Sequence, residues 1–261
     1  ANKSKSFLRE AKRLNIGVDT ASYGEQAQAL ELGLDTIHLV CTAAVKNRKL
    51  LDLALDYHIE IAVDNRDECM LIQQLAREKN TRARVNVRIS GFHFVNQIMP
   101  SRFGFDMKEV PALLAETRPG EAFDRLDYLG LHFHLNGYSI PQRAEALLQS
   151  LELIAQLNLA NFNTKTLDFG GGFLVNYLQS EEQWRAFLKG LKDATVRKRA
   201  PLTYQNDPLG MSILDGRIYG EPTVYPYFSA CTKGEFLNEI LKYKDKHGTT
   251  IHTLIAAMDL T

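Results

Sequence analysis

The chain has 261 residues and a mass of 29.5 kDa, which suits one large domain or two small ones. It is 45% hydrophobic and 24% charged, so it can bury a full core and is not a disordered chain. Basic and acidic residues balance at 31 each, which argues against a nucleic-acid partner and against a polybasic membrane surface.

Two further classes of protein are excluded by pattern. No apolar run approaches the roughly 20 residues that a membrane span needs, and the N-terminus lacks the apolar core of a signal peptide. Cys41, Cys69 and Cys231 are odd in number and far apart, and their spacing fits neither a zinc site nor a disulfide framework. We therefore expect a cytoplasmic protein with no membrane partner and no metal centre.

Strand-like and helix-like segments alternate along most of the chain. Six short apolar segments are typical of strands: residues 16–19, 36–40, 59–63, 83–89, 166–169 and a part of 126–135. Apolar residues recur at helical spacing in residues 6–14, 22–32, 46–57, 66–79, 110–117, 142–157, 181–195 and 234–247. Residues 251–260 fit either type, because a short apolar run does not distinguish them.

Two stretches interrupt this alternation. Residues 91–105 are predicted to form a long loop that carries Ser101-Arg102-Phe103-Gly104. Residues 199–233 are rich in proline and tyrosine and have no clear period. We interpret them as an irregular insertion within one domain of residues 1–261, serving either as a structural flap or as a lid.

The alternation predicts the fold class. Strands that alternate with helices through short loops form parallel sheets with right-handed crossovers. No dinucleotide-type glycine fingerprint follows the first strand, so an α/β barrel of the TIM (β/α)8 type is favoured over an open doubly wound sheet. Six strands alone leave open edges, and we therefore expect the barrel to be incomplete in this chain.

A run of three glycines follows the last predicted strand. Thr166-Leu167-Asp168-Phe169 precedes Gly170, Gly171 and Gly172, and ligand chemistry in such folds gathers at the carboxyl ends of the strands. Glycines without a Cβ let a ligand approach the backbone and leave N–H groups free to bind an anion. A tight strand-to-helix turn without a ligand is the alternative.

Two histidines lie in Leu131-His132-Phe133-His134, and their spacing predicts that both side chains point the same way from one strand. They could be a hydrogen-bonded polar pair near a strand end. They could instead bind a metal, although that would require Asp64 or Asp168 as a further ligand. A third interpretation is a flat ring that lies against a flat cofactor.

Asp19 and Arg88 also lie at predicted strand ends. Asp19 could cap the helix that follows it, as Asp and Ser often do. Arg88 is flanked by apolar residues, so it is predicted to point into the barrel, where a charge needs a partner. Either an anionic cofactor or a neighbouring Asp would serve.

Taken together, the motifs resemble one family, the pyridoxal-phosphate-dependent barrel decarboxylases, which include diaminopimelate, ornithine and arginine decarboxylases and are related in fold to alanine racemase. The segments that carry the resemblance are residues 1–2, 7–9, 18–25, 63–65, 87–88, 101–104, 130–134 and 167–173. Each segment is weak alone, but their joint order and spacing over residues 1–177 is specific.

The resemblance implies pyridoxal 5'-phosphate as cofactor and assigns roles to individual residues. Gly170, Gly171 and Gly172 match the loop that binds the cofactor phosphate, and His134 matches the imidazole that stacks on the pyridine ring. Asp19 and Arg88 match polar positions beside the cofactor. Ser139 is a further phosphate candidate in a turn that is longer than usual for the family, and His132 lies next to the stacking position.

The chain also departs from the family pattern. The Schiff-base lysine of the family lies in a Lys-Ala-Asn run, and would here immediately precede Ala1-Asn2. The family's Glu-Pro-Gly-Arg run and its C-terminal β-domain have no counterpart in these residues. We therefore expect a fragment of a longer enzyme that is inactive as given, and no catalytic residue is assigned within it.

The resemblance implies the function of the intact protein. It predicts a lyase that decarboxylates an amino acid and forms a homodimer with a shared active site. The alternatives are a non-catalytic cofactor-binding or regulatory homologue, in which the lysine would be truly missing, and an amino-acid racemase. The identity of the amino acid is not predicted.

Overall fold

The computed structural model describes residues 4–261, which divide into two compact units. The first unit contains residues 4–171 and 242–261, and the second contains residues 172–241. Among residues 4–261, no helix is both long and apolar enough to cross a bilayer.

The first unit is built on a parallel sheet. Its strands are β1 (Val18–Thr20), β2 (Leu39–Cys41), β3 (Glu60–Val63), β4 (Ala83–Ser90), β8 (Leu126–His132) and β9 (Thr166–Asp168). They pair in that order, each parallel to the next. The short strand β7 (Phe105–Asp106) pairs with the end of β4.

The strand order confirms the prediction of an incomplete barrel. Spatial order follows chain order without the reversal that defines a doubly wound sheet. The path ends at β1 on one side and at β9 on the other, so the described strands form part of a barrel wall. Beside β9, the Thr261 N–H donates to the Lys165 carbonyl (3.0 Å), and the Leu167 N–H donates to the Thr261 carbonyl (3.0 Å).

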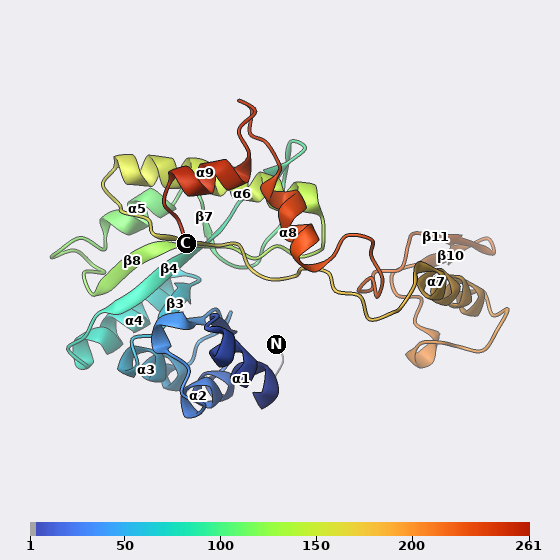
Figure 1. The fold of residues 1–261 in the computed structure, drawn as a ribbon, viewed down its shortest axis with the longest axis horizontal. Coiled ribbons are helices and arrows are strands. Elements are labelled where there is room, and N and C mark those ends of the chain that lie inside the picture. The colour runs from blue at the N-terminus through green and yellow to red at the C-terminus, as the bar shows by residue number, and fades with distance from the viewer. Residues whose placement is uncertain (1–3) are drawn as a thin grey trace. The chain divides into compact units, whose positions relative to one another are not determined.

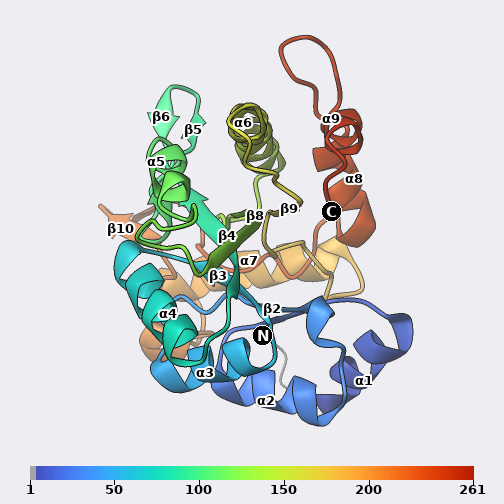
Figure 2. The same cartoon turned by 90° about the vertical axis from the view of Figure 1, so that its left-hand side faces the viewer.

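The helices of this unit lie outside the strands. They are α1 (Lys5–Leu14), α2 (Tyr23–Glu31), α3 (Arg48–Asp56), α4 (Arg66–Glu78), α5 (Val110–Ala115), α6 (Ile140–Leu159) and α9 (Ile251–Ala257). In Figure 1 and Figure 2, α1 to α4 flank the strands on their outer side, and α6 and α9 lie side by side.

The sequence sets where several helices begin. Ser22 accepts a hydrogen bond from the Glu25 N–H, and the Glu25 carboxylate accepts one from the Ala21 N–H. Asn65 and Glu68 make the same exchange at the start of α4. An N-cap residue followed three residues later by Glu satisfies two otherwise unpaired donors, which is why both helices start where the sequence predicts.

The core lies between the sheet and its helices. All four residues of β3 are buried, and β4 buries Val85, Val87 and Ile89. Strands buried on both faces are typical of parallel sheets covered by helices. This packing fixes the strand ends, and with them the site described below.

Three element predictions need correction, and one segment that fitted either type is now assigned. Residues 36–38 form the 3-10 helix η1 (Thr36–His38), so strand β2 begins later than predicted. The loop at 91–105 contains the hairpin of β5 (His93–Phe94) and β6 (Gln97–Ile98). The helix predicted at 234–247 ends at Leu241, and residues 251–257 are helical.

The second unit contains α7 (Glu181–Thr195), η2 (Tyr204–Asn206), the hairpin β10 (Ser212–Leu214) and β11 (Arg217–Tyr219), and α8 (Lys233–Leu241). Aromatic rings pack together at its centre, with Tyr177, Tyr225 and Tyr227 at centroid distances of 5.6 to 5.8 Å. Residues 199–233 belong to this unit. The single-domain boundary and the lid role of residues 199–233 remain predictions.

Candidate functional site

Polar side chains line up across the carboxyl ends of three neighbouring strands. The register pairs Arg88 on β4 with His132 on β8, and His132 with Asp168 on β9. Side chains at matched positions of adjacent strands lie on the same face of the sheet. The three residues therefore form one row at the edge where a barrel of this type binds its ligand.

Arg88 has the partner that its predicted position requires. Its Nη1 lies 3.2 Å from Asp64 Oδ1 at the end of β3, and both side chains are nearly buried. The guanidinium also lies over the Phe103 ring, 4.8 Å from the ring centroid. Of the two partners considered for Arg88, the structure shows the neighbouring Asp.

A second buried ion pair supports this one. Lys46 Nζ lies 3.0 Å from both Glu68 carboxylate oxygens, and Glu68 Oε2 accepts from the Asp64 N–H at 2.8 Å. The Lys46 side chain is 0% exposed and that of Glu68 is 7% exposed. Burial raises the pKa of Glu68, and the Lys46 charge partly offsets this. The two pairs together fix the orientation of Arg88.

His132 is held by Asp168. Its Nδ1 lies 2.9 Å from Asp168 Oδ2, and Asp168 Oδ1 accepts from the Gly170 N–H at 2.8 Å. Burial acts to raise the pKa of Asp168, but the His132 contact and the Gly170 N–H outweigh it, so this pKa lies below its usual value. The carboxylate thus connects the strand end to the glycine turn.

Gly170 lies directly against His134. A Cβ added at Gly170 would come within 2.7 Å of His134 Nδ1 and within 2.8 Å of the Phe133 carbonyl oxygen. Gly170 has φ +71°, a conformation that other residues rarely adopt. The turn predicted to bind a phosphate and the ring predicted to stack on a pyridine are therefore in contact.

The prediction that both histidines belong to one strand is wrong. Strand β8 ends at His132, and His134 lies beyond it. His132 is buried against Asp168, whereas His134 is exposed. The chain leaves the sheet once β8 has made its last pairing with β9, so the two rings have different surroundings.

The electrostatic environment keeps His134 neutral. Partial desolvation, followed by the positive charges of Arg143 and Arg88, lowers its pKa below the usual value. At neutral pH the ring is therefore uncharged. A neutral, flat ring suits contact with the face of a flat heterocycle.

Asp19 does not cap a helix. Ser22 performs that role, and the Asp19 carboxylate accepts a hydrogen bond from the Thr42 hydroxyl. Partial desolvation raises the pKa of Asp19, the Thr42 bond lowers it, and the charge of Asp168 raises it further.

The remaining predicted residues have distinct settings. Gly171 has no atom within 4 Å of an added Cβ, and Gly172, with φ +90°, begins the second unit. Ser139 Oγ caps α6 by accepting from the Gln142 N–H at 3.3 Å. The lysine predicted before Ala1-Asn2 lies outside the described residues. The cofactor roles of these residues remain predictions.

A cavity of about 470 Å³ opens beside the row. Arg88, Ser101, Arg102, Phe103 and His134 are among the residues that line it. The predicted 91–105 loop therefore contributes to the same site as β4 and the residues after β8. The cavity is large enough for a small-molecule ligand.

Among the buried charges that sequence reasoning missed are Lys46, Glu68 and Arg143. Asn65 and Glu68 have the spacing of a helix start, which was a readable signal. Arg143 lies four residues before Leu147 and eight before Leu151, on the buried face of α6. A charge on an apolar helix face was the signal for Arg143.

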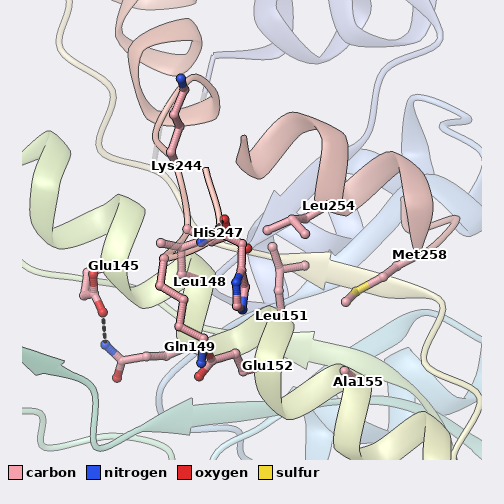
Figure 3. Close-up of a pocket in the computed structure, with 12 residues that line it drawn as sticks. Glu145, Leu148, Gln149, Leu151, Glu152, Ala155, Lys244, His247, Leu254 and Met258 are labelled. Carbon is pink, nitrogen blue, oxygen red and sulfur yellow. Dashed lines mark hydrogen bonds and ion pairs between the residues drawn. The ribbon is translucent and has the colours of Figure 1, made fainter. Parts of the chain in front are cut away.

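Another cavity, of about 440 Å³, lies between α6, α9 and the segment that precedes α9. Figure 3 shows His247 and Leu254 opposite Leu151 of α6. Lys246 Nζ lies 3.7 Å from a Glu152 carboxylate oxygen at its rim. None of the predicted site residues lines this cavity.

The residues of the site fit a phosphorylated, flat cofactor. Gly170 lets the turn pack against His134 more closely than any side chain would allow, and His134 supplies a neutral ring at the same place. Arg143, whose guanidinium lowers the pKa of His134, is 1% exposed and has two nitrogens without a hydrogen-bond partner among the described residues. An anion would satisfy that unpaired charge.

Comparison with known proteins identifies the family. Residues 1–202 match the family described as pyridoxal-dependent decarboxylase, pyridoxal binding domain. The chain is 29% identical to an uncharacterized protein, y4yA, of Sinorhizobium fredii, covering 100% of this chain and 51% of that protein. It is 26% identical to diaminopimelate decarboxylase of Campylobacter jejuni, covering 69% of this chain and 47% of that enzyme.

Solved structures agree. The crystal structure of lysine decarboxylase from Selenomonas ruminantium superposes with a TM-score of 0.59 and 26% identity, over 69% of this chain and 46% of that one. The chain thus spans about half the length of the relatives that it matches. The resemblance inferred from the motifs is confirmed, and the chain belongs to the pyridoxal-dependent decarboxylases, with the family's pyridoxal binding domain over residues 1–202.

Proposed function

We propose that this domain binds pyridoxal 5'-phosphate beside His134 and the glycine turn that begins at Gly170, and that the protein decarboxylates an amino acid. The observation that carries the proposal is the contact between Gly170 and His134, where a Cβ would come within 2.7 Å of the ring nitrogen. Two features that the family uses on opposite parts of one cofactor are adjacent here.

Each residue has a role in holding the cofactor. The backbone N–H groups of the glycine turn bind the phosphate, and His134 orients the ring by contact with its face. Arg88, whose Nη1 lies 3.2 Å from Asp64 Oδ1, supplies a positive charge to the cavity that His134 also lines. His132 is a positioning residue, because it holds Asp168, which in turn accepts from the Gly170 N–H.

The bound cofactor supplies an electron sink for the pair of electrons left at Cα when carbon dioxide leaves. The domain contributes a neutral imidazole and a partly enclosed site. Because His134 is uncharged at neutral pH, it adds no positive charge beside the cofactor ring.

The substrate and assembly are also proposals. Relatives are named diaminopimelate, arginine and lysine decarboxylases, which favours an amino acid with a polar side chain as the substrate. We further propose a homodimer, to be tested by sedimentation velocity. A cytoplasmic location is proposed because Cys41 and Cys69 are buried as free thiols.

Equilibrium dialysis tests cofactor binding. The protein is dialysed against pyridoxal phosphate and, separately, against pyridoxal, which lacks the phosphate. We expect tighter binding of the phosphorylated form and a loss of about 2- to 10-fold in affinity for His134→Ala. His247→Ala, at the cavity of Figure 3, is the matched control.

The reaction is tested on the intact protein rather than on these residues alone, by release of labelled carbon dioxide from carboxyl-labelled diaminopimelate, lysine, ornithine and arginine. Release from one of these supports the decarboxylase. Cofactor binding without release from any amino acid would instead support the non-catalytic alternative, and interconversion of enantiomers would support a racemase. Failure to bind pyridoxal phosphate at all would contradict the proposal.

A further inference from the structure

Arg143 is a buried charge without a counter-charge. Its residue is 1% exposed, and it lies in the first turn of α6. One guanidinium nitrogen, Nη2, donates to the Gly137 carbonyl at 3.0 Å. Nε and Nη1 are buried and have no hydrogen-bond partner among residues 4–261.

This arrangement is unfavourable without a ligand. Burying a guanidinium without an opposite charge is costly, and removing the partner of a buried charge is strongly destabilising. The N-terminal turn of a helix carries partial positive charge, which adds to the cost, and the first turn of α6 has no acidic residue. Burial lowers the pKa of Arg143, and Tyr138 only partly offsets this effect.

Apart from the Ile140 N–H, the donors at the start of α6 are already used or absent. Ser139 Oγ accepts from the Gln142 N–H, the Arg143 N–H donates to the Ser139 carbonyl, and Pro141 has no N–H. An anion at this end of the helix would therefore be bound by the guanidinium, while the helix dipole adds only a background field.

The guanidinium also lies close to the cofactor site. It donates to the carbonyl of Gly137, three residues after His134, and its positive charge contributes to the lowered pKa of His134. Gly170, the first residue of the glycine turn, also lies against His134. Arg143 is thus bonded to the loop that follows His134, and His134 and the glycine turn are the two groups proposed to hold the cofactor.

We propose that Arg143 binds the phosphate monoester of the cofactor through the unused N–H groups of its guanidinium. This inference rests on the proposed function, because it adds a positive side chain to the same site. A dianionic phosphate supplies the missing counter-charge, and hydrogen bonds between arginine and phosphate are among the strong ones. The buried arginine therefore makes stability of the domain depend on the ligand.

Thermal unfolding tests this dependence. The wild-type protein is compared with Arg143→Met and Arg143→Lys near neutral pH, in a buffer free of phosphate and then with inorganic phosphate. Without phosphate we expect Arg143→Met to melt at or above the wild-type temperature, because the unpaired charge is gone. With phosphate only the wild type, and to a smaller extent Arg143→Lys, should gain stability.

Arg82→Met is the control, because Arg82 pairs with Asp127 near the start of β4, at the end of the strand remote from Arg88. Its response to phosphate should equal that of the wild type. Equilibrium dialysis with pyridoxal phosphate should show about 10- to 100-fold weaker binding by Arg143→Met. Binding of pyridoxal, which has no phosphate, should be the same in both proteins.

Specific outcomes overturn the inference. If Arg143→Met loses the same stability with and without phosphate, Arg143 only holds the loop through Gly137. If the free amino acid lysine, which carries a carboxylate, raises the melting temperature of the wild type and phosphate does not, the anion that binds Arg143 is a carboxylate. If both proteins bind pyridoxal phosphate equally, this inference fails and the proposed function stands, whereas no binding by the wild type overturns both.

Discussion

The charges at the ends of β3 and β4 differ from the charge at the start of α6. At β3 and β4, Lys46 is paired with Glu68, and Asp64 with Arg88, within the chain. At α6, Arg143 is equally buried but has no acidic partner among the described residues. The first region is complete without a ligand, and the second is not.

The difference separates structural from ligand-dependent charge. Glu68 and Lys46 satisfy each other and hold the Asp64 backbone, so they set the geometry of Arg88 whether or not a ligand is present. Arg143 has no counter-charge among residues 4–261, and in our proposal the cofactor phosphate supplies it. Stability that comes from the first region should be independent of phosphate, and stability that involves the second should depend on it.

The largest expected effect comes from breaking the paired region. Glu68→Gln leaves the Lys46 charge buried and alone, and we expect it to lower the free energy of unfolding by about 3–5 kcal/mol. Urea unfolding measures this. The double variant Lys46→Met/Glu68→Gln should recover most of the loss, because it removes both charges while Gln can still accept from the Asp64 N–H. A single variant as stable as the wild type would refute the role of the pair.

Gly170→Ala tests how closely the glycine turn and the segment after β8 are packed. The added Cβ meets His134 Nδ1 and the Phe133 carbonyl, and φ is +71°. We expect a loss of about 1–3 kcal/mol in unfolding free energy. Gly171→Ala, with no atom within 4 Å, is the control for stability and should lose much less. Equal losses would mean that the contact with His134 is not close.

Asp168 makes the stability of the folded domain depend on pH. Its pKa is lower in the folded state than in the unfolded chain, because His132 and the Gly170 N–H outweigh burial. A group of this kind contributes stability above its unfolded pKa, near 4, and the contribution is lost as the pH falls through the folded value. Asp168→Asn should therefore lose stability at neutral pH and differ little from the wild type in strong acid. Unfolding curves over this pH range measure the difference.

The smallest effect is expected at an exposed pair. Arg66 Nη2 lies 2.7 Å from Glu116 Oε2, and the two side chains are 56% and 29% exposed. Glu116→Gln should change the unfolding free energy by about 0–1 kcal/mol, and less at high salt. Urea unfolding at two salt concentrations provides the baseline for the Glu68 variant. A loss as large as that of Glu68→Gln would show that burial is not what distinguishes the two pairs.

Local patterns made most of the barrel wall predictable. Helices α2 and α4 begin where Ser22 and Asn65 are followed three residues later by Glu. The buried strands carry apolar runs, and their alternation with helices gives parallel order. The hairpin at Ser212–Tyr219 was missed, although its Asp215-Gly216 turn is a recognisable hairpin signal.

Other features depended on contacts between distant residues. The sequence alone placed His132 and His134 in one strand, but pairing with β9 ends β8 at His132. The sequence allowed Asp19 to cap the following helix, but in the structure Ser22 caps α2 and Asp19 accepts a hydrogen bond from the Thr42 hydroxyl. The end of β8 and the partner of Asp19 depend on which residues are neighbours in space. A local sequence pattern does not hold that information.

By itself, the sequence determined the order of strands and helices, the family, and the glycine turn with its histidine. Periodicity and helix caps act over a few residues, so they can be read along the chain. The tertiary structure alone decided that Gly170 touches His134, that Lys46 and Glu68 are paired, and that Arg143 has no counter-charge within the described part of the chain. Burial and pairing of charge depend on residues far apart in sequence, and folding is what brings them together.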